Sequence, residues 1–134
     1  MSLNTAVYAW LNADTAITGL VGTRLYHGLP PEDLPDTETG TSLVYWRTAM
    51  RTERTLNKAD LMAIADYTVF CMAATPDAAD ALSEAVITRM FAGIKQTSGG
   101  YKIENVELLD SAFQAESMAE GIATYRNEFR ISMI

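Results

Sequence analysis

The sequence predicts an α+β fold, in which a mostly antiparallel sheet carries helices packed on one face. Three segments have apolar residues at helical spacing, and five others are rich in the β-branched and aromatic residues that favour strands. Only one long helix interrupts the strands, so most neighbouring strands are expected to pair as hairpins. The predicted order is α-α-β-β-β-α-β-β, within a single domain that covers residues 1–134.

Two helices are expected at the start of the chain. The first runs from about Leu3 to Asn12, where apolar residues recur at helical spacing and form one stripe. That stripe, which we expect to be buried, consists of Leu3, Val7, Trp10 and Leu11. Asp14 is the expected N-cap of a short second helix, and Gly22 is placed to end it in a left-handed C-cap. Residues 24–26 are expected to form a short strand.

Residues 27–40 are expected to form an acidic loop. Three of the four prolines in the chain fall here together with two glycines, and both residue types interrupt regular structure. The acidic residues of this loop are Glu32, Asp33, Asp36 and Glu38. Loops of this length in a small domain tend to be functional or disordered.

Two strands are expected after the acidic loop. Residues 41–50 contain the run Leu43-Val44-Tyr45-Trp46, and residues 61–73 contain a second apolar, strand-like run. The polar and basic residues 51–58 between them are expected to form a connection or the flared tip of a hairpin.

The longest helix has the clearest local signal. Thr75 is a good N-cap, Pro76 suits the first helical position, and Asp77 adds negative charge to the first turn. Apolar residues continue at helical spacing from Ala78 to Met90, and Gly93 is expected to end the helix.

The C-terminal part of the chain is expected to return to the sheet. A turn at residues 98–100 leads to a strand at 101–110, an acidic connection at 112–121 and a last strand at 122–134. In the last strand an apolar set alternates with a polar set, so one face should be apolar and the other polar. The apolar set is Tyr125, Phe129, Ile131 and Met133, and the polar set is Arg126, Glu128, Arg130 and Ser132.

Composition and charge restrict the function classes. Seventeen acidic against ten basic residues give a formal net charge of −7, which argues against a general nucleic-acid binder. No apolar run approaches the roughly 18 residues needed to span a bilayer, so no membrane partner is expected. The only cysteine, Cys71, lies in an apolar strand-like run and is expected to be a small buried residue.

The sequence lacks the residue patterns that carry common chemistry. It has no glycine-rich phosphate loop and no nucleophile elbow, and its single histidine, His27, has no oriented partner in sequence. One histidine and one cysteine cannot build a nitrogen–sulfur metal site. We therefore expect no enzymatic activity, cofactor or metal. A small-molecule pocket built from Tyr45, Trp46 and Tyr67 is a weaker alternative, because core packing also explains these aromatic residues.

The charge layout is the one unusual feature. Arg47, Arg51, Arg54 and Lys58 place four of the ten basic residues within twelve positions, against the single acid Glu53. This basic cluster is either a solvated strand end or an electrostatic contact surface. Its partner in the second case is the acidic loop of another copy or DNA phosphate.

Several landmarks in order resemble a known protein family. They are Ala9-Trp10-Leu11-Asn12-Ala13-Asp14, the short helix at residues 15–22, Arg24-Leu25-Tyr26, Leu29-Pro30-Pro31-Glu32, the alanine-rich helix from Ala78 to Met90, and the turn at Gly100-Tyr101. Together they resemble the small tail-completion and tail-terminator proteins of long-tailed bacteriophages and prophages, formerly a domain of unknown function. The loop is longer than in that pattern, because residues 33–40 look like an extension.

The resemblance implies a structural virion protein that caps the tail tube and joins it to the head–tail connector. It implies a six-fold ring of identical subunits, with DNA passing through without specific binding, in the tail or neck of a particle assembled in the host cytoplasm. The acidic loop and the basic cluster are then candidate subunit contacts. An alternative is a tail-assembly chaperone or small adaptor that is not retained in the virion.

Overall fold

The computed structural model describes residues 3–28, 41–54, 61–114 and 122–134. Within them the elements are α1 (Leu3–Asn12), α2 (Thr15–Val21), β1 (Leu25–His27), β2 (Ser42–Arg54), β3 (Leu61–Ala73), α3 (Pro76–Ala92), β4 (Thr97–Ser98), β5 (Tyr101–Phe113) and β6 (Ala123–Met133). This order confirms the predicted succession, with the two-residue strand β4 added at the expected turn before β5. None of the helices in these ranges is long and apolar enough to cross a membrane.

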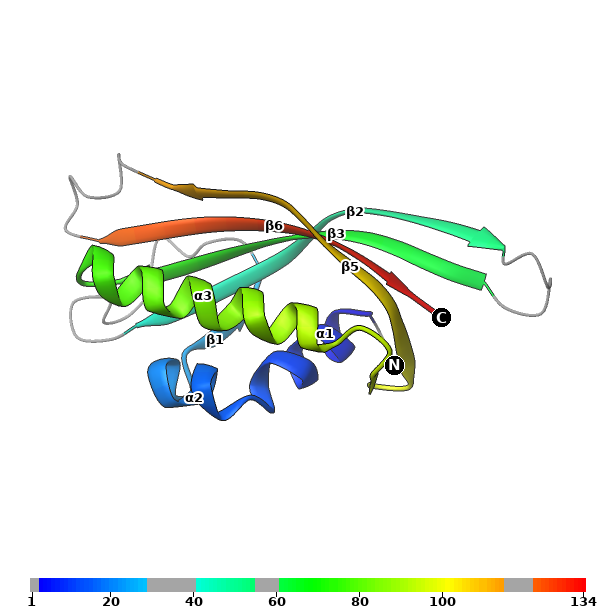
Figure 1. The fold of residues 1–134 in the computed structure, drawn as a ribbon, viewed down its shortest axis with the longest axis horizontal. Coiled ribbons are helices and arrows are strands. Elements are labelled where there is room, and N and C mark those ends of the chain that lie inside the picture. The colour runs from blue at the N-terminus through cyan, green and yellow to red at the C-terminus, as the bar shows by residue number, and fades with distance from the viewer. Residues whose placement is uncertain (1–2, 29–40, 55–60, 115–121) are drawn as a thin grey trace.

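The strands form one six-stranded sheet with the order β1-β2-β3-β6-β5-β4. Every pairing is antiparallel except that of the short β1 with β2, which is parallel. The helices lie on one side of this twisted sheet, and α3 runs along its strands (Figure 1). The predicted fold class is therefore confirmed: α+β, mostly antiparallel, with helices on one face.

The two N-terminal helices begin and end where the sequence predicts. Asp14 has the extended backbone of an N-cap, although its side chain makes no capping hydrogen bond; its carbonyl accepts from the Thr18 amide at 3.0 Å. Gly22 ends α2 with a φ of 59° and a ψ of −121°. The positive φ was expected, but this ψ lies outside the left-handed helical region.

The long helix α3 is capped as its sequence indicates. The Thr75 hydroxyl accepts a hydrogen bond from the Ala78 amide at 3.2 Å, and Pro76 opens the first turn. Gly93 ends the helix in a right-handed conformation, with a φ of −73°. A Cβ added at Gly93 would lie 3.0 Å from both Ile103 Cδ1 and Trp10 Nε1, so a glycine here allows α1, α3 and β5 to approach closely.

The core lies between the helices and the sheet. Its largest fully buried side chains include Leu11, Ile17, Leu82, Tyr45, Tyr67 and Phe129. Of the predicted stripe on α1, Leu3, Val7 and Leu11 are buried, whereas Trp10 is only half-buried. Its indole Nε1 donates to the Arg89 carbonyl at 2.9 Å, and the Arg89 guanidinium lies 3.5 Å from the ring centroid. Trp10 thus joins α1 to the end of α3 instead of filling the core, because its N–H requires an acceptor.

Candidate assembly surfaces

The β2–β3 hairpin extends past the helices (Figure 1). Its strand β2 holds Arg47, Arg51 and Arg54 of the basic cluster predicted from the sequence. β2 continues to Arg54, where it pairs with Leu61 of β3. Of the two expectations for residues 51–58, the hairpin is therefore confirmed for residues 51–54, and the plain connection is wrong there. A strand shows alternating apolar and polar residues in sequence when only one of its two faces is buried. The described residues of β2 from Arg47 to Thr52 are all exposed, so that signal is missing there.

A β-bulge divides the basic cluster between the two faces of the sheet. The register shifts between Arg47, which lies opposite Tyr67, and Ala49, which lies opposite Asp66. Tyr67 points into the core, so Arg47 lies on the helix side. Arg51 lies opposite Ile64 and therefore on the other, open face. Without the extra residue, positions 47 and 51 would face the same way.

The structure describes only part of the predicted contact residues. Arg47 and Arg51 are described in full, and Arg54 only in its backbone. The remaining predicted contact residues lie outside the described ranges; they are Glu32, Asp33, Asp36, Glu38 and Lys58. The pairing of the acidic loop with the basic cluster stays a prediction.

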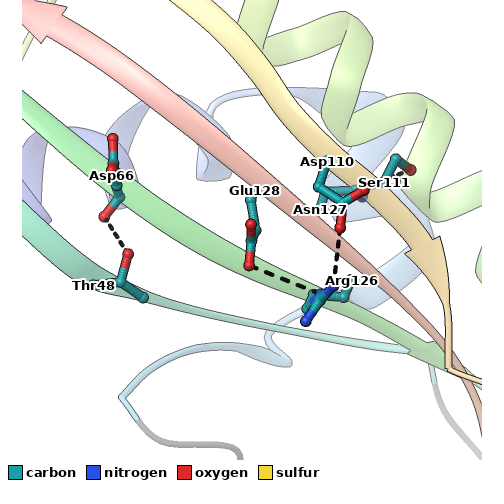
Figure 2. A network of polar contacts seen from close by, with 7 residues as sticks. All are labelled: Thr48, Asp66, Asp110, Ser111, Arg126, Asn127 and Glu128. Carbon is teal, nitrogen blue, oxygen red and sulfur yellow. Dashed lines mark hydrogen bonds and ion pairs between the residues drawn. The ribbon is translucent and has the colours of Figure 1, made fainter.

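The open face of the sheet carries ion pairs, both between neighbouring strands and within β6. Arg130 donates from Nε and Nη2 to the two carboxylate oxygens of Asp66, at 2.8 and 3.1 Å. This hydrogen bonding lowers the pKa of the Asp66 carboxyl, against a smaller opposing effect of burial. Arg126 Nη2 lies 2.9 Å from Asp110 Oδ2, and its Nε lies 3.9 Å from Glu128 Oε1 (Figure 2). The charges of these two arginines are compensated within the chain, which argues against their use as phosphate ligands.

The three aromatic residues proposed for a pocket do not converge. Tyr45 and Tyr67 point into the core, where their hydroxyls donate to Asn4 O at 3.2 Å and Asn4 Oδ1 at 2.7 Å. Burial raises the pKa of the Tyr67 phenol from 10.0 to about 12, so the hydroxyl that donates to Asn4 keeps its proton in mildly alkaline solution as well. Trp46 instead stacks edge-on with Phe70, with ring centroids 4.9 Å apart. The idea of one pocket built from Tyr45, Trp46 and Tyr67 is therefore wrong.

Cys71 belongs to a buried polar network under α3. Asn127 Nδ2 donates to Ser83 Oγ at 2.9 Å and points to Cys71 Sγ at 3.7 Å, while Asn127 Oδ1 accepts from Ser111 Oγ at 2.6 Å (Figure 2). Burial raises the pKa of the Cys71 thiol to about 12, so it is a poor nucleophile. Among the described residues, no three His, Cys, Asp or Glu side chains lie close enough to hold a metal ion.

Both edges of the sheet have long stretches that pair with no described strand. β1 covers β2 only from Leu43 to Tyr45, and β4 covers only the first two residues of β5. Beyond these points, residues 46–54 of β2 and 104–113 of β5 have no described strand beside their outer edge, and we call these stretches the free edges of the sheet. The β5 edge was missed from the sequence. The adjacent apolar pair Leu108-Leu109, which is exposed and interrupts the alternation, is the signal that could have revealed it.

The comparisons with known proteins show a shared fold. No family model matches the chain, and no curated protein sequence matches it. Among solved structures, the chain is similar to a chain described as "Virion of native gene transfer agent (GTA) particle", with a TM-score of 0.71 and 22% sequence identity. The similarity covers 98% of this chain and 94% of that chain, so the fold is shared over nearly the full length of both.

Proposed function

We propose that this protein is a structural component of a phage-like virion, which caps the tail tube and joins it to the head–tail connector as a six-fold ring. The observation that carries the proposal is the fold similarity, over nearly the whole of both chains, to a component of a virion particle. The ordered sequence landmarks that resemble tail-terminator proteins support the same function independently. Its partners are further copies of itself, the tail tube protein and the connector protein.

The charge of the chain supports passage of DNA through such a ring. Each subunit carries a formal net charge of −7, so a ring of subunits repels DNA phosphates and is not expected to bind DNA tightly. Free protein is therefore expected to show no appreciable DNA affinity at physiological salt in a fluorescence-anisotropy titration. Micromolar affinity with a steep salt dependence would contradict this and assign the basic cluster to phosphate.

The acidic loop and the basic cluster remain our candidates for part of the subunit contact. Surface ion pairs contribute only about 0–1 kcal/mol each, so they would set register and assembly rate more than affinity. Arg51→Glu with Arg54→Glu is expected to leave the subunit folded but to impair assembly. Adding Asp33→Lys and Asp36→Lys is expected to restore part of it.

Deletion of the gene in its own host tests the proposed function. A cap that stops tube growth and connects it to the head leaves tubes of uncontrolled length and unattached heads when it is removed, which negative-stain electron microscopy would reveal. Mass spectrometry of purified wild-type particles should then find the protein. Tails that fail without the protein, from particles that never contain it, would favour the alternative of an assembly chaperone or adaptor. Normal particles after deletion would refute both.

A further inference from the structure

The two free edges of the sheet are complementary to one another. We propose that the free edge of β5 in one copy pairs with the free edge of β2 in a second copy, so that neighbouring copies share one continuous antiparallel sheet. This inference rests on the proposed ring, for which it names the subunit contact. An unpaired strand edge presents N–H and C=O groups that can pair with another strand.

The regular parts of the two edges define where the contact would form. On β5 the register with β6 shifts between Ile103 and Asn105 and again between Leu108 and Asp110. The stretch 105–108 between these shifts is regular. On β2 the stretch 49–54, beyond the bulge, is regular as well. Both stretches are as long as short strands, and no described strand pairs with the outer edge of either.

The side chains on the two stretches match on both faces of the sheet. Glu107 lies opposite Arg130 on the open face and interacts with its charge, and Arg51 of β2, on the same face, interacts with Asp66 in its own chain. Leu108 lies opposite the buried Phe129, on the helix side, and Met50 is on that side too. Leu108 is 36% exposed and Met50 48%, so each presents apolar surface to solvent in the single chain. A shared sheet would place an acid near a base on one face, and two apolar side chains together on the other.

Strand directions make the pairing antiparallel. The successive antiparallel pairs β2–β3, β3–β6 and β6–β5 mean that β2 and β5 run in opposite directions. A rotation about an axis that runs roughly along the strands keeps these directions, so β5 meets β2 of the next copy in antiparallel orientation. The contact joins two different edges and is therefore heterologous, which produces a ring or a filament instead of a closed dimer.

Cysteine cross-linking tests the pairing directly. Met50→Cys and Leu108→Cys place thiols on the same face of the two edges, and the native Cys71 is buried and unreactive. Neighbouring strands lie about 5 Å apart, so a short bismaleimide spans the contact and tolerates a small register difference. Within one chain Met50 is level with Val106 across the sheet, so Leu108 lies three strand spacings away and two residues further along, about 16 Å in all. The double variant at high concentration is expected to give a ladder that extends beyond the dimer on a denaturing gel.

Matched variants make the result specific. Met50→Cys mixed with Leu108→Cys should give dimers, whereas either variant alone should stay monomeric on the gel. Leu20→Cys combined with Leu108→Cys is the control, because Leu20 is equally exposed but lies on α2. Dimers from either single variant would show like-with-like edge pairing and overturn the proposal. A ladder from the Leu20 control as strong as that from the double variant would do the same.

Charge reversal tests whether Arg51, which interacts with Asp66 in its own chain, also meets Glu107 of the neighbouring copy. Arg51→Glu or Glu107→Arg alone is expected to lower the yield of cross-linked species at least threefold, and the two together are expected to restore it. Restoration of the single Arg51→Glu variant by Asp33→Lys and Asp36→Lys, but not by Glu107→Arg, would assign Arg51 to the acidic loop and overturn the edge pairing. Restoration of only the Arg51→Glu, Arg54→Glu double variant by the loop substitutions assigns the loop to Arg54 and keeps the edge pairing.

The outcome separates this inference from the proposed function. Rings seen by electron microscopy without any ladder would overturn the edge pairing and keep the virion role, with the contact on other surfaces. A ladder from a protein that is never found in particles would support the edge pairing and refute the virion role. The absence of any ladder, at every concentration tested, overturns the pairing whatever the particles contain.

Discussion

Replacement of Asn127 by leucine tests whether the buried polar network stabilises the fold. Asn127 is fully buried between the sheet and α3, where its amide joins Ser83, Ser111 and Cys71. Leucine has a similar size, so Asn127→Leu changes hydrogen bonding more than volume. The substitution therefore isolates the contribution of the polar contacts.

The loss of stability expected for Asn127→Leu depends on how deeply each hydrogen-bond partner of Asn127 is buried. Ser111 is exposed, so its hydroxyl can turn to water when the amide is lost. Ser83 is buried and loses the amide donor at 2.9 Å. A buried polar group without its partner costs about 1–3 kcal/mol, and the Ser83 hydroxyl can recover part of this by donating to the helix backbone. We expect Asn127→Leu to lower the free energy of unfolding by about 2 kcal/mol.

Urea denaturation of four proteins measures this cost: wild type, Asn127→Leu, Ser83→Ala and the double variant. Removal of both polar partners leaves no unsatisfied hydroxyl, so the double variant is expected to recover at least about 1 kcal/mol relative to the sum of the single variants. Additive single effects would show that Asn127 and Ser83 are not coupled. A single Asn127→Leu variant as stable as wild type would refute the reasoning.

Three further predictions follow from single contacts. Trp10→Ala is expected to lower the free energy of unfolding by about 3 kcal/mol, the low end for tryptophan, because Trp10 is half-buried; an unchanged thermal melt would refute this. The Cys71 thiol is expected to react with Ellman's reagent only after unfolding, since burial raises its pKa to about 12, and fast reaction of the folded protein would contradict its burial. The pKa of Asp66 is lowered in the folded state, so its contribution to stability is present above the ordinary aspartate pKa of about 3.9 and is lost as pH falls below it. Asp66→Asn should therefore be less stable than wild type at pH 7, and the difference should shrink in denaturation experiments near pH 3.

Local signals explain why the helices and β3 were predicted well. Thr75, Pro76 and Gly93 fix the bounds of α3 by chemistry within a few residues, and the predicted strand at 61–73 coincides with β3. The strand ends were predicted less well. β2 continues to Arg54, and β5 continues to Phe113, into the expected connection at residues 112–121. Most of the side chains described at these two ends are exposed, so the burial that produces a strand pattern in sequence does not act on them.

Asn127 shows a second limit of sequence reasoning. The apolar set of the last strand has odd numbers, and residue 127 falls in that set by position. Because Asn127 is an amide, it is not a member of the apolar set predicted for this strand, although the alternation alone places it inward. Its partners Ser83 and Cys71 come from α3 and β3, so only the tertiary fold shows that a buried amide is satisfied there.

The bulge in β2 changes what the basic cluster can contact. In sequence, four basic residues within twelve positions suggest one patch, but the extra residue places Arg47 on the helix side and Arg51 on the open face. A loop that docks on one face of the hairpin meets only one of these two arginines. A strand that pairs along the edge of the hairpin has side chains on both faces, and in the proposed pairing Glu107 of β5 would meet Arg51 while Leu108 would meet Met50. The division of charge between the faces therefore means that a loop on one face cannot engage the whole basic cluster, and the contact between the acidic loop and this cluster stays a prediction.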